Sequence, residues 1–488
     1  MKVEQLHGPS QKTLQVVELE YLLQCDSPDV FSQKGFNKEG KIIVARAPAR
    51  LDIMGGIADY CGANVFQMTL NRAAIAAIQP RNDKKLLALT IQDEKLLVPS
   101  VQMSLDDFYE DDKLKSYTKV RNMMSTKENS AWIGYVLGCF FTLLKEEKVE
   151  KFSHGAVVVI KSDIPMGAGI ASSAAIEVAT LSVINQQYRL GLKPIEIARL
   201  GQVVENRVVG APCGIMDQVT ATLGKKNKIL SLLCQPDKIL EYVDCPANVS
   251  FIGIHPKVHR STKSSAYVDT RTAAFMGLTI LKKELAWDKL DTNYLCDLTV
   301  EEYEERCIPL LPQKVHGCEF IEKYGQSVDT VTQVKPDKIY NVRNCVNHPV
   351  YENARVKQFI DAIKNVHAYP HHAQQYLTEA GKLMYESNAS YRDCAGLGCP
   401  EIDGIVNIAQ KIGPRGGIYG AKITGGGGGG TAALLCYGDV STSLTQILSA
   451  YKLAWDILTT TFKGSSAGAN EFGHIVWELA ENEPLRHF

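Results

Sequence analysis

The chain has 488 residues, of which 45% are hydrophobic and 22% are charged. That much apolar material is enough for one large or two ordinary hydrophobic cores, which excludes disorder as the dominant state. Lysine and arginine number 53 against 54 aspartate and glutamate residues, so the formal net charge is -1. This balance leaves no surplus of positive charge for binding nucleic acid or an anionic membrane, and no dense Lys/Arg run supplies one locally.

Three features bear on the compartment in which the chain resides. The longest apolar stretch, Ile133 to Leu144, is too short to span a bilayer, and the first residues lack the basic and apolar regions of a secretory signal. The 13 cysteines include no C-x-x-C pair, and the closest two, Cys394 and Cys399, have no second Cys or His pair at metal-ligand spacing. We therefore expect a soluble, cytoplasmic protein with reduced cysteines and no membrane partner.

The first half of the chain alternates strand and helix patterns. β-Branched runs indicate strands, and apolar residues at helical spacing or small residues after a turn indicate helices. The elements predicted there are a helix around 14–22, strands over 41–47 and 155–161, a helix from about Ser172, and a helix from Pro194 to about Arg207 that ends at the Gly210–Gly214 turn.

Beyond about residue 245 the pattern changes to mixed strands and helices, where we place a second domain. A more irregular stretch, 286–344, carries an acidic cluster that is expected to be solvated. The elements predicted in this half are a strand over 249–255, a helix over 273–285, and two strands flanking the glycine run 425–430.

Three small-residue segments are candidates for holding a phosphate: 165–175, 210–214 and 425–430. Glycine lets backbone N–H groups turn inward, and a helix N-terminus adds the favourable end of the helix dipole. A tight turn explains any one of these segments equally well. The first is stronger, because the hydroxyls of Ser172 and Ser173 stand where the helix begins and can bind phosphate oxygens or hydrated Mg²⁺. The chain has neither a P-loop motif nor a protein-kinase H-R-D or D-F-G set.

Two other motifs are rejected. Gly464–Gly468 matches G-x-S-x-G, but it follows a predicted helical stretch and not the strand that a hydrolase nucleophile requires. His367, His371 and His372 cluster near a proline without a cysteine nearby, so a solvated loop is a better interpretation than a metal site.

Acidic residues around two turns suggest a reaction centre. Glu205 and Asp217 flank the second glycine turn, so one carboxylate could bind a metal ion while the other accepts a proton. Arg50 and Asp59 frame an earlier turn, where an ion pair that stabilises the loop is the alternative.

Taken together, these segments resemble the three motifs of the GHMP small-molecule kinases. The segment APARLDIMGGIADY (47–60) is similar to the sugar-binding signature of galactokinases, PMGAGIASSAA (165–175) to the phosphate loop, and AKITGGGGGG (421–430) to the third glycine motif. CGIMDQ (213–218), the Ser265–Tyr267 region and residues 383–403 are also galactokinase-like. The resemblance implies an α/β, two-domain fold with the active site in the cleft: a helical extension (1–40), a ribosomal S5 domain 2-like N-terminal domain (41–245) and a ferredoxin-like C-terminal domain (246–488).

The resemblance also implies roles for individual residues in ATP-dependent phosphoryl transfer. Asp217 would deprotonate or orient the anomeric hydroxyl of a sugar, Arg50 would stabilise charge at the γ-phosphate, and Glu205 with Ser173 would hold Mg²⁺. The expected sugar-binding residues are Arg50, Asp59, Cys213, Gly214, Asp217 and Tyr267. The expected ATP-binding residues are Trp132, Pro165, Gly167, Ala168, Gly169, Ile170, Ala171, Ser172 and Ser173.

One departure from galactokinases concerns the substrate. Galactokinases have Glu-His where this chain has Gly56-Ile57, and this replacement is the pattern of L-arabinokinases, whose sugar lacks the hydroxymethyl group of galactose. L-Arabinose is therefore the expected substrate, with galactose or a uronic acid as alternatives. A uronate would need a cation, which Arg260, Lys263 or Arg271 could supply. A non-catalytic sugar sensor is the alternative of another class, and a monomer or weak homodimer is expected.

Overall fold

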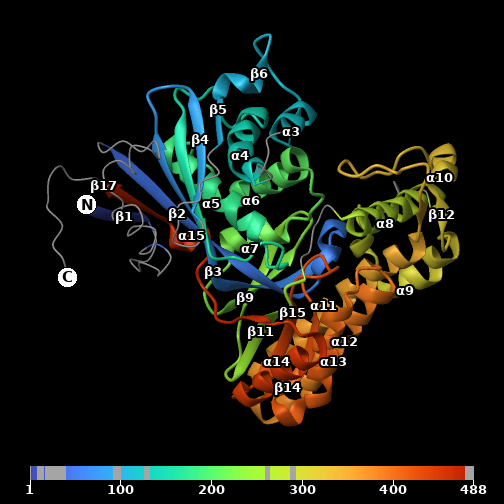
Figure 1. Cartoon of the computed structure of the whole chain (residues 1–488). Helices are drawn as coiled ribbons and strands as arrows, with labels where there is room; N and C mark the ends of the chain where they lie inside the picture. Colours follow the sequence, from blue (N-terminus) through green and yellow to red (C-terminus); the bar gives the residue numbers. More distant parts are fainter. Residues whose placement is uncertain are drawn as a thin grey trace.

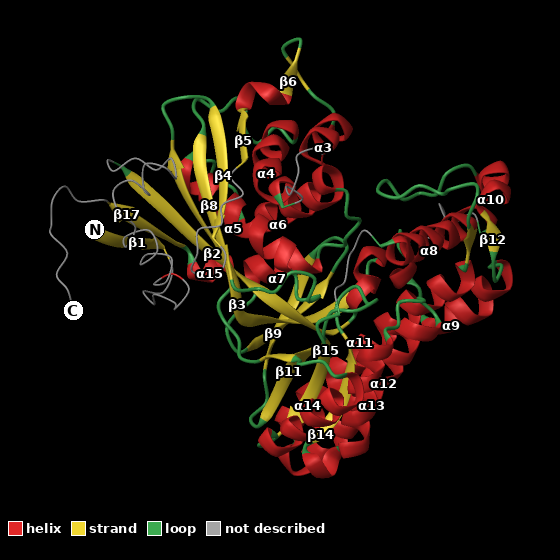
Figure 2. Ribbon diagram, viewed as in Figure 1, coloured by secondary structure: helices red, strands yellow, loops and turns green. Residues whose placement is uncertain are grey.

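The computed structural model describes residues 2–7, 16, 40–91, 101–125, 132–258, 264–285 and 293–478. Strands and helices are mixed throughout, and they form two lobes that meet near the middle of the molecule (Figures 1 and 2). Among the described residues, no helix is long and apolar enough to cross a membrane.

A nine-stranded, mostly antiparallel sheet forms the first lobe. Its centre is made by two long strands, β2 (Lys41–Met54) and β3 (Asn64–Pro80), which are almost entirely buried. β8 pairs with β3 in antiparallel and with β4 in parallel orientation. The other strands are β1 (Lys2–His7), β4 (Lys85–Ile91), β5 (Val101–Ser104), β8 (Ala156–Ser162), β9 (Lys228–Leu233), β10 (Lys238–Asp244) and β17 (His474–Glu478).

Helices cover one face of this sheet and carry the predicted motifs. α5 (Ser172–Gln187) follows β8 through the 165–171 loop and packs on both β2 and β3. The sequence therefore predicted this strand, loop and helix correctly. The other helices of the lobe are α3 (Tyr117–Ser125), α4 (Ile133–Lys145), α6 (Pro194–Val203), the π-helical η3 (Val204–Val209), α7 (Met216–Leu223) and α15 (Ala469–Phe472).

The second lobe is built on a four-stranded antiparallel sheet in the order β14, β15, β11, β16. The third glycine motif is the connection between β14 and β15, as the sequence predicted. The strands are β11 (Val249–His255), β14 (Ile418–Ile423), β15 (Ala432–Tyr437) and β16 (Thr460–Phe462). The long helices are α8 (Ser265–Glu284), α11 (Val342–Ala368), α12 (Ala373–Asp393), α13 (Pro400–Ile412) and α14 (Ser441–Trp455).

Short elements occupy the stretch that the sequence marked as irregular, on the arm that carries α9 and α10 (Figure 1). The residues of its acidic cluster are mostly exposed, as expected. The elements are η5 (Leu295–Asp297), α9 (Val300–Glu302), η6 (Tyr303–Cys307), η7 (Ile308–Leu310), β12 (Val315–His316), α10 (Gly317–Tyr324) and β13 (Ile339–Tyr340).

Two features of the fold differ from the sequence-based expectation. Residues 2–7 form a strand that pairs with β17, where a helical extension was expected, while the apolar residues that suggested the helix lie outside the described residues. β17 in turn pairs with β2, so the last described strand returns to the first lobe. α8 begins at Ser265, eight residues earlier than predicted, because the Ser264 side chain caps it by accepting a hydrogen bond from the Tyr267 N–H.

The G-x-S-x-G segment also has a different context from the one predicted. It follows the short strand β16 and precedes α15, so the expectation of a preceding helix was wrong. Its two serines connect this segment to β3 through polar contacts. Ser465 Oγ lies 3.1 Å from Thr69 Oγ1, and Ser466 Oγ donates to the carbonyl of Leu70 at 2.6 Å.

Candidate active site

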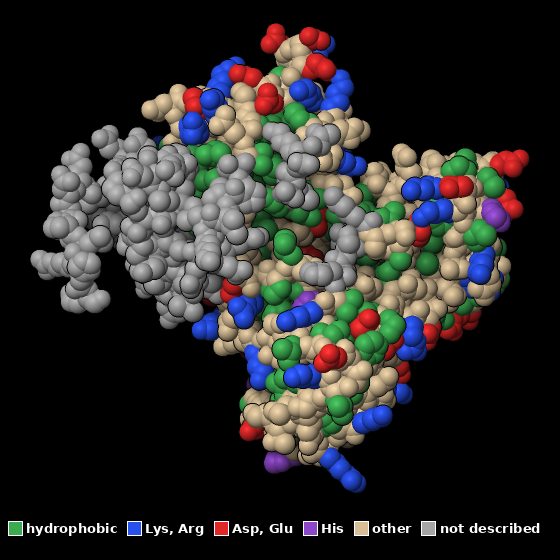
Figure 3. Space-filling view, in the orientation of Figure 1, with side chains coloured by type: hydrophobic (Ala, Val, Ile, Leu, Met, Phe, Trp, Pro, Cys, Tyr) green, Lys and Arg blue, Asp and Glu red, His purple; other side chains and the backbone are tan. Residues whose placement is uncertain are grey.

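A cavity of about 240 Å³ lies where the two lobes meet. In Figure 3 the molecule is hollowed near its middle, where hydrophobic and some acidic side chains are visible. Thirteen of the residues predicted for the site line the cavity. They are Arg50, Asp59, Trp132, Gly167, Gly169, Ala171, Ser172, Ser173, Glu205, Cys213, Gly214, Asp217 and Tyr267.

An arginine and an aspartate form an ion pair on the cavity wall. Arg50, from β2, donates through Nε to Asp217 Oδ1 at 2.8 Å and through Nη1 to the Gly169 carbonyl at 2.8 Å. Its side chain is completely buried, whereas that of Asp217, at the start of α7, is 18% exposed. The Nη2 group of Arg50 also lies 2.7 Å from Asp217 Oδ1. The pair therefore presents a carboxylate and a guanidinium donor at one point of the cavity.

A second group of polar side chains includes a hydroxyl and two carboxylates. Ser173 Oγ donates to Glu205 Oε1 at 2.9 Å, and Gln218 Nε2 donates to Glu205 Oε2 at 2.8 Å. Gln218 also donates to Glu177 Oε2 at 3.1 Å. Burial, followed by repulsion from Glu205, raises the pKa of Glu177 well above its usual value. Hydroxyl and carboxylate oxygens are the ligands that Mg²⁺ prefers, so Ser173 and Glu205 fit a divalent cation.

Glu205 lies on an irregular turn of helix. α6 continues into the π-helical η3, in which Glu205 is the second residue, and Gly210 ends this turn with a φ of 81°. Single π-helical turns are often found at functional sites because they redirect one side chain. Here the turn places the Glu205 carboxylate against Ser173, the second residue of α5.

Asp59 is buried on the other side of the cavity. Its carboxylate packs so closely on Gly214 that a Cβ atom there would stand 1.9 Å from Asp59 Oδ2, which explains why position 214 is glycine. Burial and then the charge of Asp217 raise the pKa of Asp59 to about 7, although Arg271 and two backbone N–H groups act in the opposite direction. Asp59 Oδ1 is buried and accepts no hydrogen bond from the described residues, so it can accept one from a ligand hydroxyl.

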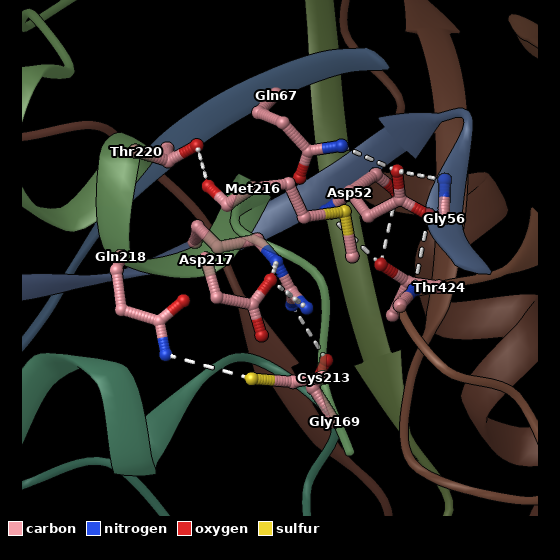
Figure 4. A network of polar contacts seen from close by, with 12 residues as sticks. Asp52, Gly56, Gln67, Gly169, Cys213, Met216, Asp217, Gln218, Thr220 and Thr424 are labelled. Atoms are coloured by element: carbon pink, nitrogen blue, oxygen red, sulfur yellow. Dashed lines mark hydrogen bonds and ion pairs between the residues drawn. The ribbon is translucent and has the colours of Figure 1, made fainter. Parts of the chain in front are cut away.

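The turn that follows β2, within the 47–60 segment, is held by contacts with the second lobe. Asp52, fully buried on β2, lies 3.1 Å from the ammonium of Lys422 and accepts hydrogen bonds from the N–H groups of Gly56 and Gly425 (Figure 4). The Ile57 N–H donates to the hydroxyl of Tyr391, which in turn donates to the Gly425 carbonyl. Ile57 lines the cavity, whereas Gly56 is turned toward Tyr391.

The phosphate loop has the backbone conformation that its glycines predict. Gly167 and Gly169 have φ values of 71° and 72°, and Ala171 takes the same left-handed region at 64°. Three predicted loop residues, Pro165, Ala168 and Ile170, do not line the cavity. The carbonyls of Ala168 and Ile170 instead hold the loop in place, since they accept hydrogen bonds from Thr431 Oγ1 and the Arg50 N–H.

Of the three cations considered for a uronate, the structure describes Arg271, which is engaged elsewhere. Arg271 is paired with Asp329 at 2.8 Å and donates to the Cys213 carbonyl at 3.1 Å, and it is not among the residues that line the cavity. Arg260 and Lys263 lie outside the described residues. No group of three or more His, Cys, Asp or Glu side chains within the described part of the chain is arranged as a metal site, and this includes His367, His371 and His372.

Some cavity residues were not predicted. Tyr135 lies one helical turn after Trp132, and Ile176 lies one turn after Ser172 and Ser173, so helical periodicity applied to the motif residues would have found both. Met166, Met216 and Gly426 lie within the motif segments 165–175, 213–218 and 421–430 but were not assigned individually to the site.

Models of known families match three parts of the chain. The GHMP kinases N-terminal domain matches residues 134–225, the galactokinase galactose-binding signature residues 31–80, and the GHMP kinases C-terminal domain residues 362–452. The chain thus contains the N- and C-terminal domains of the GHMP kinases and the galactose-binding signature of galactokinases. The three matches contain all the residues that line the cavity except Trp132 and Tyr267.

Two curated sugar kinases are similar to this chain. It is 34% identical to the L-arabinokinase of Arabidopsis thaliana over 90% of the chain and 47% of that protein, and 28% identical to the galactokinase of Clostridium perfringens over 83% of the chain and 89% of that protein. The chain thus spans about half the length of the arabinokinase.

Among solved structures, that of Lactococcus lactis galactokinase complexed with galactose matches with a TM-score of 0.68 at 22% identity, covering 90% of this chain and 97% of that one. Mevalonate kinase of Methanococcus jannaschii matches with a TM-score of 0.51 at 16% identity, covering 87% and 98%. These likenesses show the two-domain fold.

Proposed function

We propose that this chain is an ATP-dependent sugar kinase that phosphorylates the anomeric hydroxyl of L-arabinose. The observation that carries the proposal is the convergence of the Arg50–Asp217 pair, the Ser173–Glu205 pair and the glycine loop on one cavity. Phosphoryl transfer needs alignment and charge stabilisation more than covalent catalysis, and this arrangement offers both. The similarity to two curated sugar kinases supports the same reaction.

In this proposal the new O–P bond forms between the anomeric oxygen and the γ-phosphorus, while the bond from phosphorus to the ADP oxygen breaks. Asp217 accepts the proton of the anomeric hydroxyl or orients that hydroxyl for attack. The guanidinium group of Arg50, which lines the cavity, donates to the oxygens of the transferring phosphoryl group, where negative charge is concentrated. The N–H groups of the 167–173 loop, at the start of α5, hold the phosphates of ATP.

Ser173 and Glu205 would hold Mg²⁺ beside these phosphates. The bound ion would neutralise charge on the phosphate oxygens. Glu177 shares the Gln218 amide with Glu205 and keeps it in place, and its raised pKa favours the neutral form of this second carboxyl. Trp132 and Tyr135, which both line the cavity, would contact the nucleotide.

The proposed preference for L-arabinose rests on Gly56 and Ile57, where galactokinases have Glu-His. Gly56 offers no carboxylate, and Ile57 presents an apolar side chain to the cavity. A hydroxymethyl group on the sugar would meet this apolar wall without a partner for its hydroxyl. Galactose and a uronic acid remain the alternatives, and Arg271, the described cation considered for a uronate, is paired with Asp329.

A panel of free sugars tests the proposal directly. Purified protein with Mg·ATP is offered L-arabinose, galactose, galacturonate and glucose, and ADP release is measured together with the sugar 1-phosphate formed. We expect the highest kcat/KM with L-arabinose. Higher kcat/KM with galactose would reassign the substrate, whereas sugar binding without ADP release would favour the sensor and overturn the kinase.

A further inference from the structure

The Gly210–Gly214 turn separates two cavities. Cys213 and Gly214 line the proposed sugar site on the inner side, and Gly210 and Pro212 line a second cavity of about 550 Å³ on the outer side. Residues 211–214 are buried, and Ala211 packs in the hydrophobic core of the first lobe. Polar contacts to the backbone of the turn act together with this packing.

Those contacts converge on the backbone of Cys213. Its N–H donates to Asn206 Oδ1 at 2.8 Å, and its carbonyl accepts from Asn206 Nδ2 at 3.2 Å. The same carbonyl accepts from Arg271 Nη1 at 3.1 Å. Asn206 belongs to the first lobe, as does the turn, but Arg271 reaches across from α8 of the second lobe.

Arg271 is itself fixed by a buried ion pair. Its Nε and Nη2 groups donate to the two carboxylate oxygens of Asp329 at 2.8 and 2.9 Å, and the two side chains are only 6% and 2% exposed. Asp329 also accepts hydrogen bonds from the backbone of Val331 and from the backbone and hydroxyl of Thr332. Bidentate pairing of this kind sets the orientation of a guanidinium group.

We propose that Arg271 and Asp329 are positioning residues of the sugar site, which hold the Cys213–Gly214 turn against Asp59 from outside the cavity. This proposal rests on the proposed function, because it assigns Asp59 to sugar binding. Gly214 and Asp59 are in contact, so a displacement of the turn changes the shape of the site at the carboxylate. The guanidinium carbon of Arg271 also lies 5.2 Å from the ring centre of Tyr60, the neighbour of Asp59.

The pair acts on Asp59 through charge as well. Arg271 lowers the pKa of Asp59, against burial and Asp217, which raise it to about 7. The titratable and charged groups around Asp59 are Arg50 on β2, Tyr60 and Cys61 on its own turn, Cys213, Asp217 on α7, Cys234 after β9, and Tyr267 and Arg271 on α8. Removing the Arg271 charge should raise the pKa of Asp59, while removing the compensating Asp329 charge should lower it.

The opposite shifts expected in the pKa of Asp59 allow the proposal to be tested. Arg271→Gln and Asp329→Asn are compared with Arg199→Gln, which removes the arginine of an equally bidentate pair with Asp237 at the surface. We expect both variants to raise the KM for the sugar roughly tenfold with the KM for ATP unchanged. The acid limb of kcat/KM for the sugar should move to higher pH in Arg271→Gln and to lower pH in Asp329→Asn. The control should match the wild type in all of these measurements.

Other outcomes separate the two proposals. If wild-type protein and control phosphorylate no sugar, the proposed function is wrong. If the wild type is active and Asp329→Asn keeps its sugar KM and pH profile, the positioning role is wrong. Should Arg271→Gln not fold, Arg271→Lys keeps the charge but loses the bidentate geometry. We then expect a raised sugar KM with an unmoved acid limb, and an unchanged KM would overturn the proposal.

Discussion

Gly56 lies directly against the hydroxyl group of Tyr391. A Cβ atom at position 56 would stand 1.5 Å from Tyr391 Oη, 2.8 Å from the ring carbon that bears it, and 2.9 Å from the Gly425 carbonyl oxygen. The φ of Gly56 is also positive, at 47°. Position 56 therefore cannot carry the glutamate of galactokinases unless the contact between the signature and the third glycine motif is rebuilt.

We accordingly expect Gly56→Ala to lower the free energy of unfolding by about 3 kcal/mol, because backbone strain and overpacking act together. Gly191→Ala is the matched control, since Gly191 has a φ of 68° and no atom within 4 Å of a Cβ. Strain alone should cost the control about 1 kcal/mol. Urea unfolding followed by circular dichroism measures both. Equal losses in the two variants would show that Tyr391 moves aside easily.

Ile57 can be changed without this conflict, and it should control the choice of sugar. In Ile57→Ala the smaller side chain leaves room for the hydroxymethyl group of galactose. The kcat/KM for L-arabinose divided by that for galactose should therefore fall roughly tenfold. Ile53→Val, four residues earlier on β2 and away from the cavity lining, controls for loss of core packing. An unchanged ratio in Ile57→Ala would place this side chain away from C5 of the sugar.

Asp217 should be needed for turnover and not for binding. Asp217→Asn keeps an oxygen that can accept the Arg50 hydrogen bond but loses the negative charge and the basic site. We expect kcat to fall at least about 100-fold with little change in the KM for either substrate. Asp237→Asn, at the surface pair with Arg199, is the control. A kcat within a few-fold of the wild type would remove Asp217 from the mechanism.

Glu205 should govern the use of Mg²⁺. Glu205→Gln replaces a carboxylate by a poorer ligand for a hard cation, so the Mg²⁺ concentration for half-maximal activity should rise about tenfold. Ser173→Ala should act in the same direction but less. Ser182→Ala, farther along α5, where the hydroxyl donates to the Val178 carbonyl, serves as control. An unchanged Mg²⁺ dependence in Glu205→Gln would leave that residue a purely structural role.

The sequence predicted the elements that follow local rules. The 165–175 segment could be interpreted as strand, loop and helix because small residues, glycines and a serine N-terminus act locally. The partner of Asp52 could not be predicted, since Lys422 is 370 residues away and only the folded sheets bring the two together. The partner of Arg271 could not be predicted for the same reason. Its charge suggested an open cationic site, but the fold neutralises it with Asp329 from a segment without recognisable motifs.

Asp59 should make the stability of the protein depend on pH. Its folded-state pKa is raised to about 7 from a usual value of 3.8, mainly by burial and then by Asp217. Between these values the folded state holds a proton that the unfolded state has released, so this group's contribution to stability is full below about pH 4 and is lost as the pH rises through about 7. One pKa unit corresponds to about 1.4 kcal/mol, which sets an upper limit of a few kcal/mol on this contribution to stability.

Asp59→Asn cannot titrate. We therefore expect the wild type to lose more unfolding free energy than Asp59→Asn between pH 4.5 and 7.5, measured by urea unfolding, with Asp237→Asn behaving as the wild type. Parallel pH curves for the wild type and Asp59→Asn would mean that Asp59 is ionised throughout this range, and that its unpaired oxygen is in contact with water.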